Sequence, residues 1–350
     1  DRGLLKLYQG KVVDANTNAS NGDTNPYGVA VVPQTIGSLV AGNLLIADFN
    51  NTYGTSGAGT SIVQVNPQTG MTTDFATAQS LDNAALTGPV EIAINPANDY
   101  VWVGDFGTAA DGSASNYLVI SPTGTLVSVE SNATVAGNPS LGSWTNPFAG
   151  VWGAAVGVNA STMATSFYWT NIAGTASAAG SGEVWRTNPQ GPSLPADSTF
   201  TPLAVGLPAN PSMLLGPKGL AYDPQNDTLY VTDSANNAVY AIPHASTATG
   251  PVTPKLLYQN GPLSQPQDLA LYPHSGLLVT VNGAAGPRGN NDMVGISTTG
   301  MLRGVVDLAS RQPAGGLFGV SPGPLSTHRF PTFYYDNANT SSLHLIAPNW

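Results

Sequence analysis

Two acidic residues and a lysine stand at the starts of short apolar segments, each close behind a proline. Glu91 and Asp268 lie two residues after a proline, and Lys218 lies directly after one. A carboxylate in such a place can act as a general base or a metal ligand, and a lysine can stabilise an oxyanion. Glu91, Lys218 and Asp268 are therefore the candidate catalytic residues.

Aromatic and amide side chains occupy related positions in the neighbouring segments. Together with the charged residues they can form a pocket for a small polar or sugar-like molecule. The predicted ligand-binding residues are Tyr27, Glu91, Trp152, Lys218, Gln267 and Asp268. As alternatives, the two aromatic rings can pack against a neighbouring sheet. The two acids can face a channel or point away from it by strand alternation, and can bond main-chain amides, pair with Lys218 or hold a metal with loop oxygens.

The segments that carry these residues belong to a sequence repeat that occurs six times along the 350 residues. In its clearest copy, an apolar strand at 216–224 ends in proline, a second strand at 228–233 ends in aspartate, and a third covers 238–243. A repeat of roughly 40–60 residues built only from strands is typical of a β-propeller, in which each blade buries its faces against its neighbours. The sequence therefore predicts an all-β chain forming a single six-bladed propeller of four-stranded blades.

The prolines that end most of the first strands set the predicted register. We expect one domain over residues 1–350, with innermost strands at 27–33, 90–96, 152–158, 218–224, 267–273 and 316–322. The blades extend approximately over 25–76, 88–130, 148–205, 216–260, 265–308 and 314–350, the last completed by residues 3–13. In particular, residues 4–9 resemble the outer strand at 255–259. We expect this N-terminal strand to complete the C-terminal blade and so to remove two exposed sheet edges.

Composition limits the partners. The net charge of −10 disfavours nucleic acid and anionic membrane surfaces. No run of about 18 apolar residues occurs, so no membrane span is expected. The absence of cysteine excludes disulfides and thiolate metal sites. A surface poor in charge and rich in Asn, Thr, Ser and Gly favours a secreted or periplasmic protein in its mature form, without its signal peptide.

Other patterns carry less weight. The four histidines have no metal-binding spacing. The segment GVSPG at 319–323 matches a serine-hydrolase motif but lacks the strand–elbow–helix context that the motif requires. An Asp or Asn closes the second strand of every blade, and this regularity indicates a turn-forming role.

Long loops gather on one predicted face. The connections between second and third strands are long at 50–60, 107–116, 173–182 and 283–292, and the entries into inner strands are extended at 15–25 and 131–146. Both kinds of connection emerge on the same face of a propeller. Long loops on one face are typical of a binding surface, with tolerated decoration as the alternative.

The repeat resembles a known group of propellers. GPKGLAYDP at 216–224 followed by LYVTDS at 229–234 is similar to the repeat of NHL-type propellers and of the regucalcin, gluconolactonase and strictosidine-synthase-like group. NPYGVA at 25–30 and QPQDLA at 265–270 repeat the likeness, which covers essentially the whole chain. The resemblance implies the six-bladed fold, while the motifs mostly encode blade geometry.

The resemblance also implies a metal site that this sequence has altered. In the metal-dependent lactonases and esterases of the group, the residue after the proline contributes much of the ligation of calcium or a similar cation. Here those positions hold Tyr27, Val90, Trp152, Lys218, Gln267 and Gly316. A calcium ion takes about six to eight oxygen ligands, and a lysine would place positive charge at the ion. We therefore expect no metal and no other cofactor, with calcium held by Glu91 and Asp268 as the alternative.

Three hypotheses for function follow. The leading one is an extracytoplasmic NHL-like propeller that binds a small polar molecule, an extracellular protein or a polysaccharide through its long-loop face. The first alternative is a lactonase- or esterase-type hydrolase related to regucalcin-like enzymes, with a degenerate or altered metal site. The second alternative is a structural propeller that self-assembles. Whether the chain is an enzyme stays open at this point.

Overall fold

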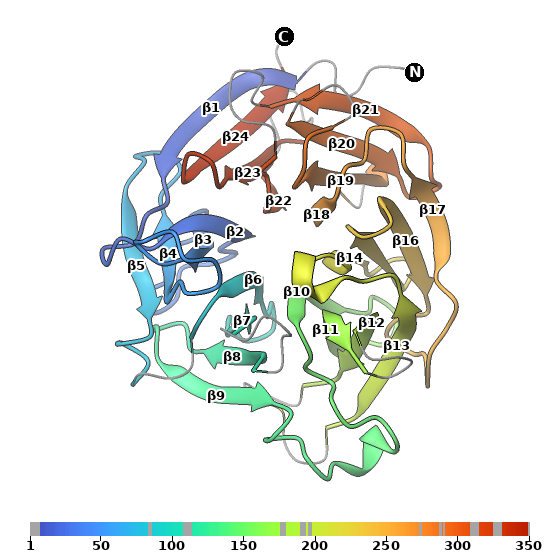
Figure 1. The fold of residues 1–350 in the computed structure, drawn as a ribbon. Coiled ribbons are helices and arrows are strands. Elements are labelled where there is room, and N and C mark those ends of the chain that lie inside the picture. The colour runs from blue at the N-terminus through green and yellow to red at the C-terminus, as the bar shows by residue number, and fades with distance from the viewer. Residues whose placement is uncertain are drawn as a thin grey trace.

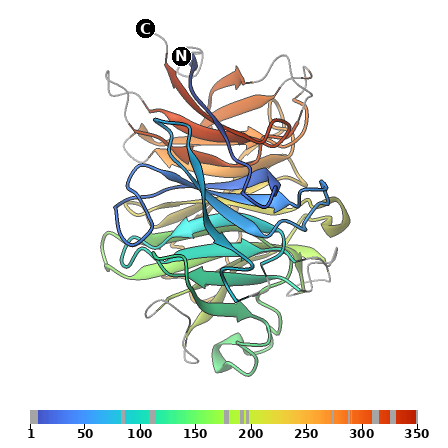
Figure 2. The ribbon, with the colours of Figure 1, turned by 90° about the vertical axis from the view of Figure 1, so that its left-hand side faces the viewer.

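The chain forms a ring of sheets around a central axis. The computed structural model describes residues 8–82, 86–107, 114–175, 180–189, 194, 198–272, 275–286, 289, 291–308, 315–324 and 331–348. Over these residues there are six four-stranded antiparallel sheets. Figure 1 shows the inner strands β2, β6, β10, β14, β18 and β22 around the centre, and Figure 2 shows the ring from the side. The predicted all-β, six-bladed propeller is confirmed.

The first three blades follow one another along the chain. From the inner to the outer strand, the first blade contains β2 (Thr24–Val31), β3 (Leu44–Asn50), β4 (Ser61–Val65) and β5 (Thr72–Thr77). The second blade contains β6 (Pro89–Ile94), β7 (Val101–Asp105), β8 (Asn116–Ile120) and β9 (Leu126–Ser131). The third blade contains β10 (Val151–Val158), β11 (Thr165–Gly174), β12 (Ser181–Thr187) and β13 (Phe200–Leu207).

The last three blades complete the ring. The fourth blade contains β14 (Pro217–Asp223), β15 (Thr228–Asp233), β16 (Ala238–Pro243) and β17 (Lys255–Gln259). The fifth contains β18 (Pro266–Tyr272), β19 (Leu277–Asn282), β20 (Asp292–Ser297) and β21 (Leu302–Asp307). The sixth contains β22 (Val320–Pro322), β23 (Phe333–Asn337), β24 (Ser342–Pro348) and β1 (Tyr8–Asn16). Two single 3₁₀ turns, η2 (Pro139–Leu141) and η3 (Pro211–Met213), lie in loops. Within the described ranges, no helix has the length and apolar character needed to cross a bilayer.

Polar turn residues end the strands. Between β4 and β5, the side-chain oxygen of Asn66 accepts hydrogen bonds from the amides of Gln68 (2.9 Å) and Thr69 (3.1 Å). Gly70 follows with a φ of +72°, a conformation that glycine adopts without a Cβ clash. A polar turn at 66–70 therefore joins the third strand of the first blade to its outer strand.

Apolar clusters between neighbouring blades hold the ring together. Between the first and second blades, Leu45 and Ile62 pack with Ile92, Val103 and Leu118. Among the described residues, every adjacent pair of blades shares such a cluster. Each blade thus buries both faces of its sheet against its neighbours, which is the arrangement that the sequence repeat predicts.

The N-terminal strand closes the ring, as the sequence predicts. β1 pairs antiparallel with β24, with Ala15 opposite Leu343. The strand is described over Tyr8–Asn16, while residues 4–7 of the predicted segment lie outside the described residues. Ala15 is 2% exposed in the cluster between the sixth and first blades, so the closing strand also contributes to the core.

A one-residue bulge interrupts the inner strands close to their beginnings. In the second blade Pro89 lies opposite Asp105 and Ile92 lies opposite Val103, so that three steps along β6 match two along β7. The same register shift occurs in β2, β10, β14 and β18. Bulges re-aim side chains and are frequent beside functional sites. The residues inside the bulge, Glu91 and Asp268 among them, therefore do not follow simple strand alternation.

Acidic residues at the ends of second strands fix the main chain that enters the inner strands. Asp105 accepts a hydrogen bond from the amide of Thr87 (2.7 Å), just before β6. Asp336 accepts hydrogen bonds from the amides of Phe318 (3.1 Å) and Gly319 (3.0 Å), just before β22. These contacts support the structural interpretation of the repeated Asp or Asn.

Removal of the closing strand should destabilise the whole ring. Deletion of residues 1–16 takes away the main-chain partner of β24 and the buried contact of Ala15. We expect the melting temperature, followed by circular dichroism, to fall by roughly 10 °C, because several kcal/mol of hydrogen bonding and apolar burial are lost. A synthetic peptide covering residues 8–16 should restore part of the loss in trans. A truncated chain that melts with the parent would show that β1 does not close the ring.

Candidate active site

At one level along the central axis, only two of the six inner strands carry a side chain. At this level four inner strands carry glycine and two carry an acid, in the order Gly28, Glu91, Gly153, Gly219, Asp268 and Gly319. A Cβ at any of the four glycines would come closer than 3.0 Å to a main-chain atom of a neighbouring inner strand. The strands thus approach too closely for a side chain in four blades. The space on the axis is left to Glu91 and Asp268.

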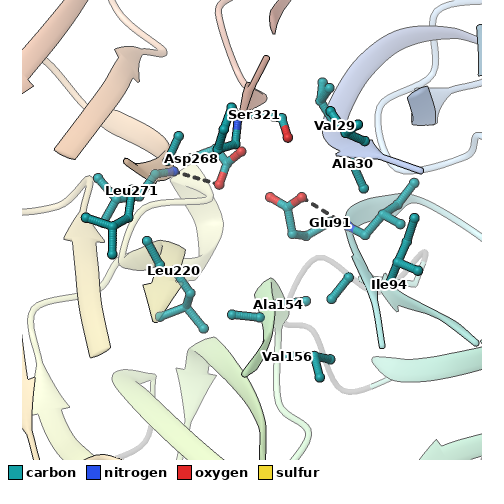
Figure 3. A pocket seen from close by; sticks show the side chains of 18 of the residues that line it. Val29, Ala30, Glu91, Ile94, Ala154, Val156, Leu220, Asp268, Leu271 and Ser321 are labelled. Carbon is teal, nitrogen blue, oxygen red and sulfur yellow. Dashed lines mark hydrogen bonds between the residues drawn. The ribbon is translucent and has the colours of Figure 1, made fainter. Parts of the chain in front are cut away.

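The two acids face each other across the axis. Glu91 belongs to the second blade and Asp268 to the fifth, which lie on opposite sides of the ring. Figure 3 shows their carboxyl groups pointing toward one another. They line a cavity of about 470 Å³ whose other walls come from the later halves of the inner strands. The cavity therefore lies toward the face where inner strands turn back into second strands, opposite the face of the long loops.

Main-chain amides hold both carboxyl groups in place. Glu91 Oε1 accepts a hydrogen bond from the amide of Ile92 (3.0 Å). Asp268 accepts one from the amide of Leu269 (2.6 Å) and one from the amide of Val320 (2.9 Å). Because Val320 belongs to β22, Asp268 also links the fifth blade to the sixth. The sequence left open whether the two acids face the channel or bond main-chain amides. In the structure they do both.

Burial and mutual proximity set the protonation of the pair. Burial raises the pKa of Asp268 to about 7, although the two amides and a hydrogen bond with Glu91 act in the lowering direction. Burial, followed by the negative charge of Asp268, raises the pKa of Glu91 well above its ordinary range. Two carboxyl groups in contact ionise as a unit. Around neutral pH, burial and this coupling therefore favour a protonated Glu91 beside an Asp268 that is partly ionised.

The long-loop end of the axis is filled by aromatic rings. Tyr27 stacks between Phe318 (ring centroids 3.9 Å apart) and Phe49 (4.3 Å). Phe106 meets Trp152 edge-on at 5.7 Å. These rings belong to one buried apolar cluster with Val90 and Ile172. The residue types at these positions predict a ligand pocket here. The structure differs because the large side chains at the starts of the inner strands converge on the axis and pack together.

Lys218 lies inside this packed end and away from the two acids. Its side chain is 2% exposed, and Nζ donates a hydrogen bond to Gln267 Oε1 (2.5 Å). Nζ also lies 3.8 Å from the centroid of a Trp152 ring. Burial lowers the pKa of Lys218 well below its ordinary range. The lysine therefore pairs with an amide and an aromatic face, and the cavity lining does not include it.

The structure thus divides the six predicted site residues into two groups. Glu91 and Asp268 come together at the cavity, whereas Tyr27, Trp152, Lys218 and Gln267 are buried together at the other end of the axis. A ligand-binding role for these four stays a prediction.

The sequence register missed Phe318 in the sixth blade. Gly319 approaches the carbonyl of Tyr27 as Gly28 approaches that of Val90, so Phe318 is the residue equivalent to Tyr27, in place of Gly316. Phe49 and Phe106 were also missed. Their signal was an aromatic residue directly after the aspartate that closes a second strand.

The residues present do not fit the calcium site that the resemblance implies. The positions after the prolines hold stacked rings and the buried Lys218 amine, which offer a cation no set of oxygen ligands. At the acid pair, three carboxylate oxygens already accept main-chain amides. In the described part of the chain, no three Asp, Glu, His or Cys side chains are grouped so as to hold a metal ion.

Comparison with known proteins identifies the fold. No family model matches the chain, and no curated protein matches its sequence. Solved structures do match over nearly the whole chain. A gluconolactonase from Xanthomonas campestris has a TM-score of 0.57 at 13% identity, covering 98% of this chain and 98% of its own. Regucalcin from Agrobacterium tumefaciens, described as a calcium-binding protein, has a TM-score of 0.57 at 11% identity, with coverages of 97% and 94%.

A third match has a different role. An auxiliary nutrient binding protein from Bacteroides thetaiotaomicron has a TM-score of 0.57 at 11% identity, covering 97% of this chain and 72% of its own. At such identities the likeness shows the fold alone, and that fold is the gluconolactonase- and regucalcin-like six-bladed propeller. The expected resemblance to this group is confirmed at the level of structure.

The pairing of Lys218 with Gln267 can be tested through stability. Lys218→Met alone leaves Gln267 Oε1 buried without a donor, and we expect a loss of about 1–3 kcal/mol in the free energy of unfolding. Lys218→Met combined with Gln267→Leu removes both partners and the cost of burying the amine, so the double variant should match or exceed the parent. Chemical denaturation measures both. A double variant less stable than the single one would contradict this pairing.

Proposed function

We propose that this chain is a hydrolase of the lactonase or esterase type, with Glu91 and Asp268 as its acid–base pair. The observation that supports the proposal most is the pair itself: two carboxyl groups, sharing one proton, on the wall of a cavity whose described lining has no other charged side chain. The shared fold with a gluconolactonase agrees with this choice but does not transfer the activity.

The first half of the reaction uses both members of the pair. The Asp268 carboxylate takes a proton from a water molecule as the water oxygen bonds to the carbonyl carbon of the substrate. Glu91 gives its proton to the carbonyl oxygen, so no full negative charge develops on it. The result is a neutral tetrahedral intermediate, with Asp268 protonated and Glu91 ionised.

The second half restores the starting state. The bond between carbon and the ring or alcohol oxygen breaks, and Asp268 gives its proton to that leaving oxygen. One hydroxyl of the intermediate returns a proton to Glu91 as the carboxylic acid product forms. Asp268 suits the role of base because two amides hold its carboxylate, and burial brings its pKa to about 7, close to the working pH.

Binding without turnover is the second candidate. Asp268 bonds the amide of Val320 in the next blade, and this contact gives the acid a structural role that needs no catalysis. In this version the same cavity recognises a small molecule, on the face opposite the long loops through which the sequence predicts binding. An extracytoplasmic location belongs to both versions and is supported by the charge-poor composition.

Replacement of the acid by its amide separates the two candidates. Glu91→Gln keeps the oxygen that accepts the amide of Ile92 and an NH₂ group that can donate to Asp268, but it has no proton to transfer. With δ-decalactone, glucono-δ-lactone and p-nitrophenyl butyrate as substrates, we expect kcat to fall about 10²- to 10⁴-fold with an unchanged melting temperature.

The pH profile gives a second readout in the same assay. For the parent chain, kcat should rise with pH through about 7 as Asp268 ionises, and fall at higher pH as Glu91 loses its proton. A Glu91→Gln variant that hydrolyses as fast as the parent would overturn the acid–base role of Glu91, and a parent that hydrolyses none of the three substrates would overturn the hydrolase assignment. Saturable binding with no turnover by the parent would favour the binding candidate.

A further inference from the structure

Past Glu91 and Asp268, most side chains that line the cavity are apolar. Apart from main-chain groups, its described walls consist mostly of alanine, valine, leucine, isoleucine and proline side chains. Two hydroxyl groups are the exceptions. That of Tyr222 already donates to Asp227 (3.0 Å), and that of Ser321 lies on β22. The side chains therefore offer few hydrogen-bond partners along the length of the cavity.

The described lining of the cavity offers no positive charge to an anionic group. It includes Glu91 and Asp268 and no lysine or arginine. The described loops that lead from inner to second strands, at 33–43, 95–100, 159–164 and 224–227, contain no lysine or arginine either. In the sixth blade the corresponding loop contains Arg329, which lies outside the described residues. Lys218 is bound to Gln267 at the other end of the axis. Among the described residues, a ligand with a phosphate or carboxylate would therefore meet only negative charge.

Apolar side chains also stand exposed in the same loops. Ile36 is 41% exposed and Val40 is 43% exposed in the loop of the first blade, and Met163 is 72% exposed in that of the third. These loops border the face on which the cavity lies. Apolar contacts are therefore available both outside and inside the channel.

From these three observations we propose that the cavity takes an uncharged substrate with a slender apolar body, whose carbonyl group reaches Glu91 and Asp268. A neutral lactone or ester with a hydrocarbon chain has this chemistry. The side chains of the walls offer the hydroxyl groups of a sugar-derived lactone few partners, so these hydroxyl groups would have to bond main-chain groups of the inner strands, a requirement that an apolar substrate does not have. The inference rests on the proposed function and specifies its substrate class.

Calorimetric binding to the parent chain tests the substrate class without any turnover. Three small ring compounds that cannot be hydrolysed serve as probes: 2-pentylcyclopentanone is neutral and apolar, myo-inositol is a polyol, and cyclohexanecarboxylate is an anion. The ketone should bind at least about tenfold more tightly than the other two, a difference of about 1.4 kcal/mol. Equal or tighter binding of the polyol or the anion, or no binding of the ketone, would overturn the inference.

A charged residue introduced into the cavity wall tests whether the probes bind in this cavity. Val156 is half-buried and lines the cavity (Figure 3). Val156→Lys should raise the affinity for cyclohexanecarboxylate and lower that for the ketone about tenfold, relative to Val156→Met of similar length. Identical binding by the two variants would show that the ligands bind elsewhere. Because the probes are inert, this outcome is independent of the Glu91→Gln kinetics, and either proposal can fail alone.

Discussion

The inner strands of the propeller approach one another so closely that a side chain is excluded at four of six equivalent positions. Gly28, Gly153, Gly219 and Gly319 each face a main-chain atom of a neighbouring inner strand where a Cβ would stand. This steric constraint determines what the axis can hold. Glu91 and Asp268 extend into the remaining space from opposite blades, and they meet because nothing else at that level competes for it. Their burial on opposite sides of the same small space, in turn, raises the pKa of both and couples their ionisation.

The two ends of the central axis of the propeller differ in packing. At the long-loop end, aromatic rings and the Lys218–Gln267 pair fill the space and contribute to the core. Past the acid pair, small side chains such as Ala30, Ala93 and Ala221 leave a cavity open. The same repeat therefore builds a packed core over one part of each inner strand and a binding cavity over the other. A change from bulky to small residues along the strand is sufficient to produce both.

The architecture could be predicted from the sequence because each of the six repeats specifies the strands and turns of one blade. The inner strands and the closure by the N-terminus could both be predicted, and the closing strand is described over Tyr8–Asn16. The sequence also placed Glu91 and Asp268 among six candidate site residues. It could not decide where they point, because strand alternation fails at the bulge after each proline. Nor could it tell that Tyr27 would stack on Phe318 of the sixth blade and on Phe49 of its own blade, or that Trp152 of the third blade would pack against Phe49. Phe318 and Trp152 reach these partners only in the closed ring.

The central claim is that Glu91 and Asp268 form one proton-sharing pair. Carboxyl ¹³C NMR of the folded protein, labelled in aspartate and glutamate, measures this directly as pH is varied. The account predicts that the pair ionises in two steps, one near pH 7 and one higher, and that Glu91→Gln removes the higher step. Two independent ionisations near pH 4, unaffected by that substitution, would contradict it.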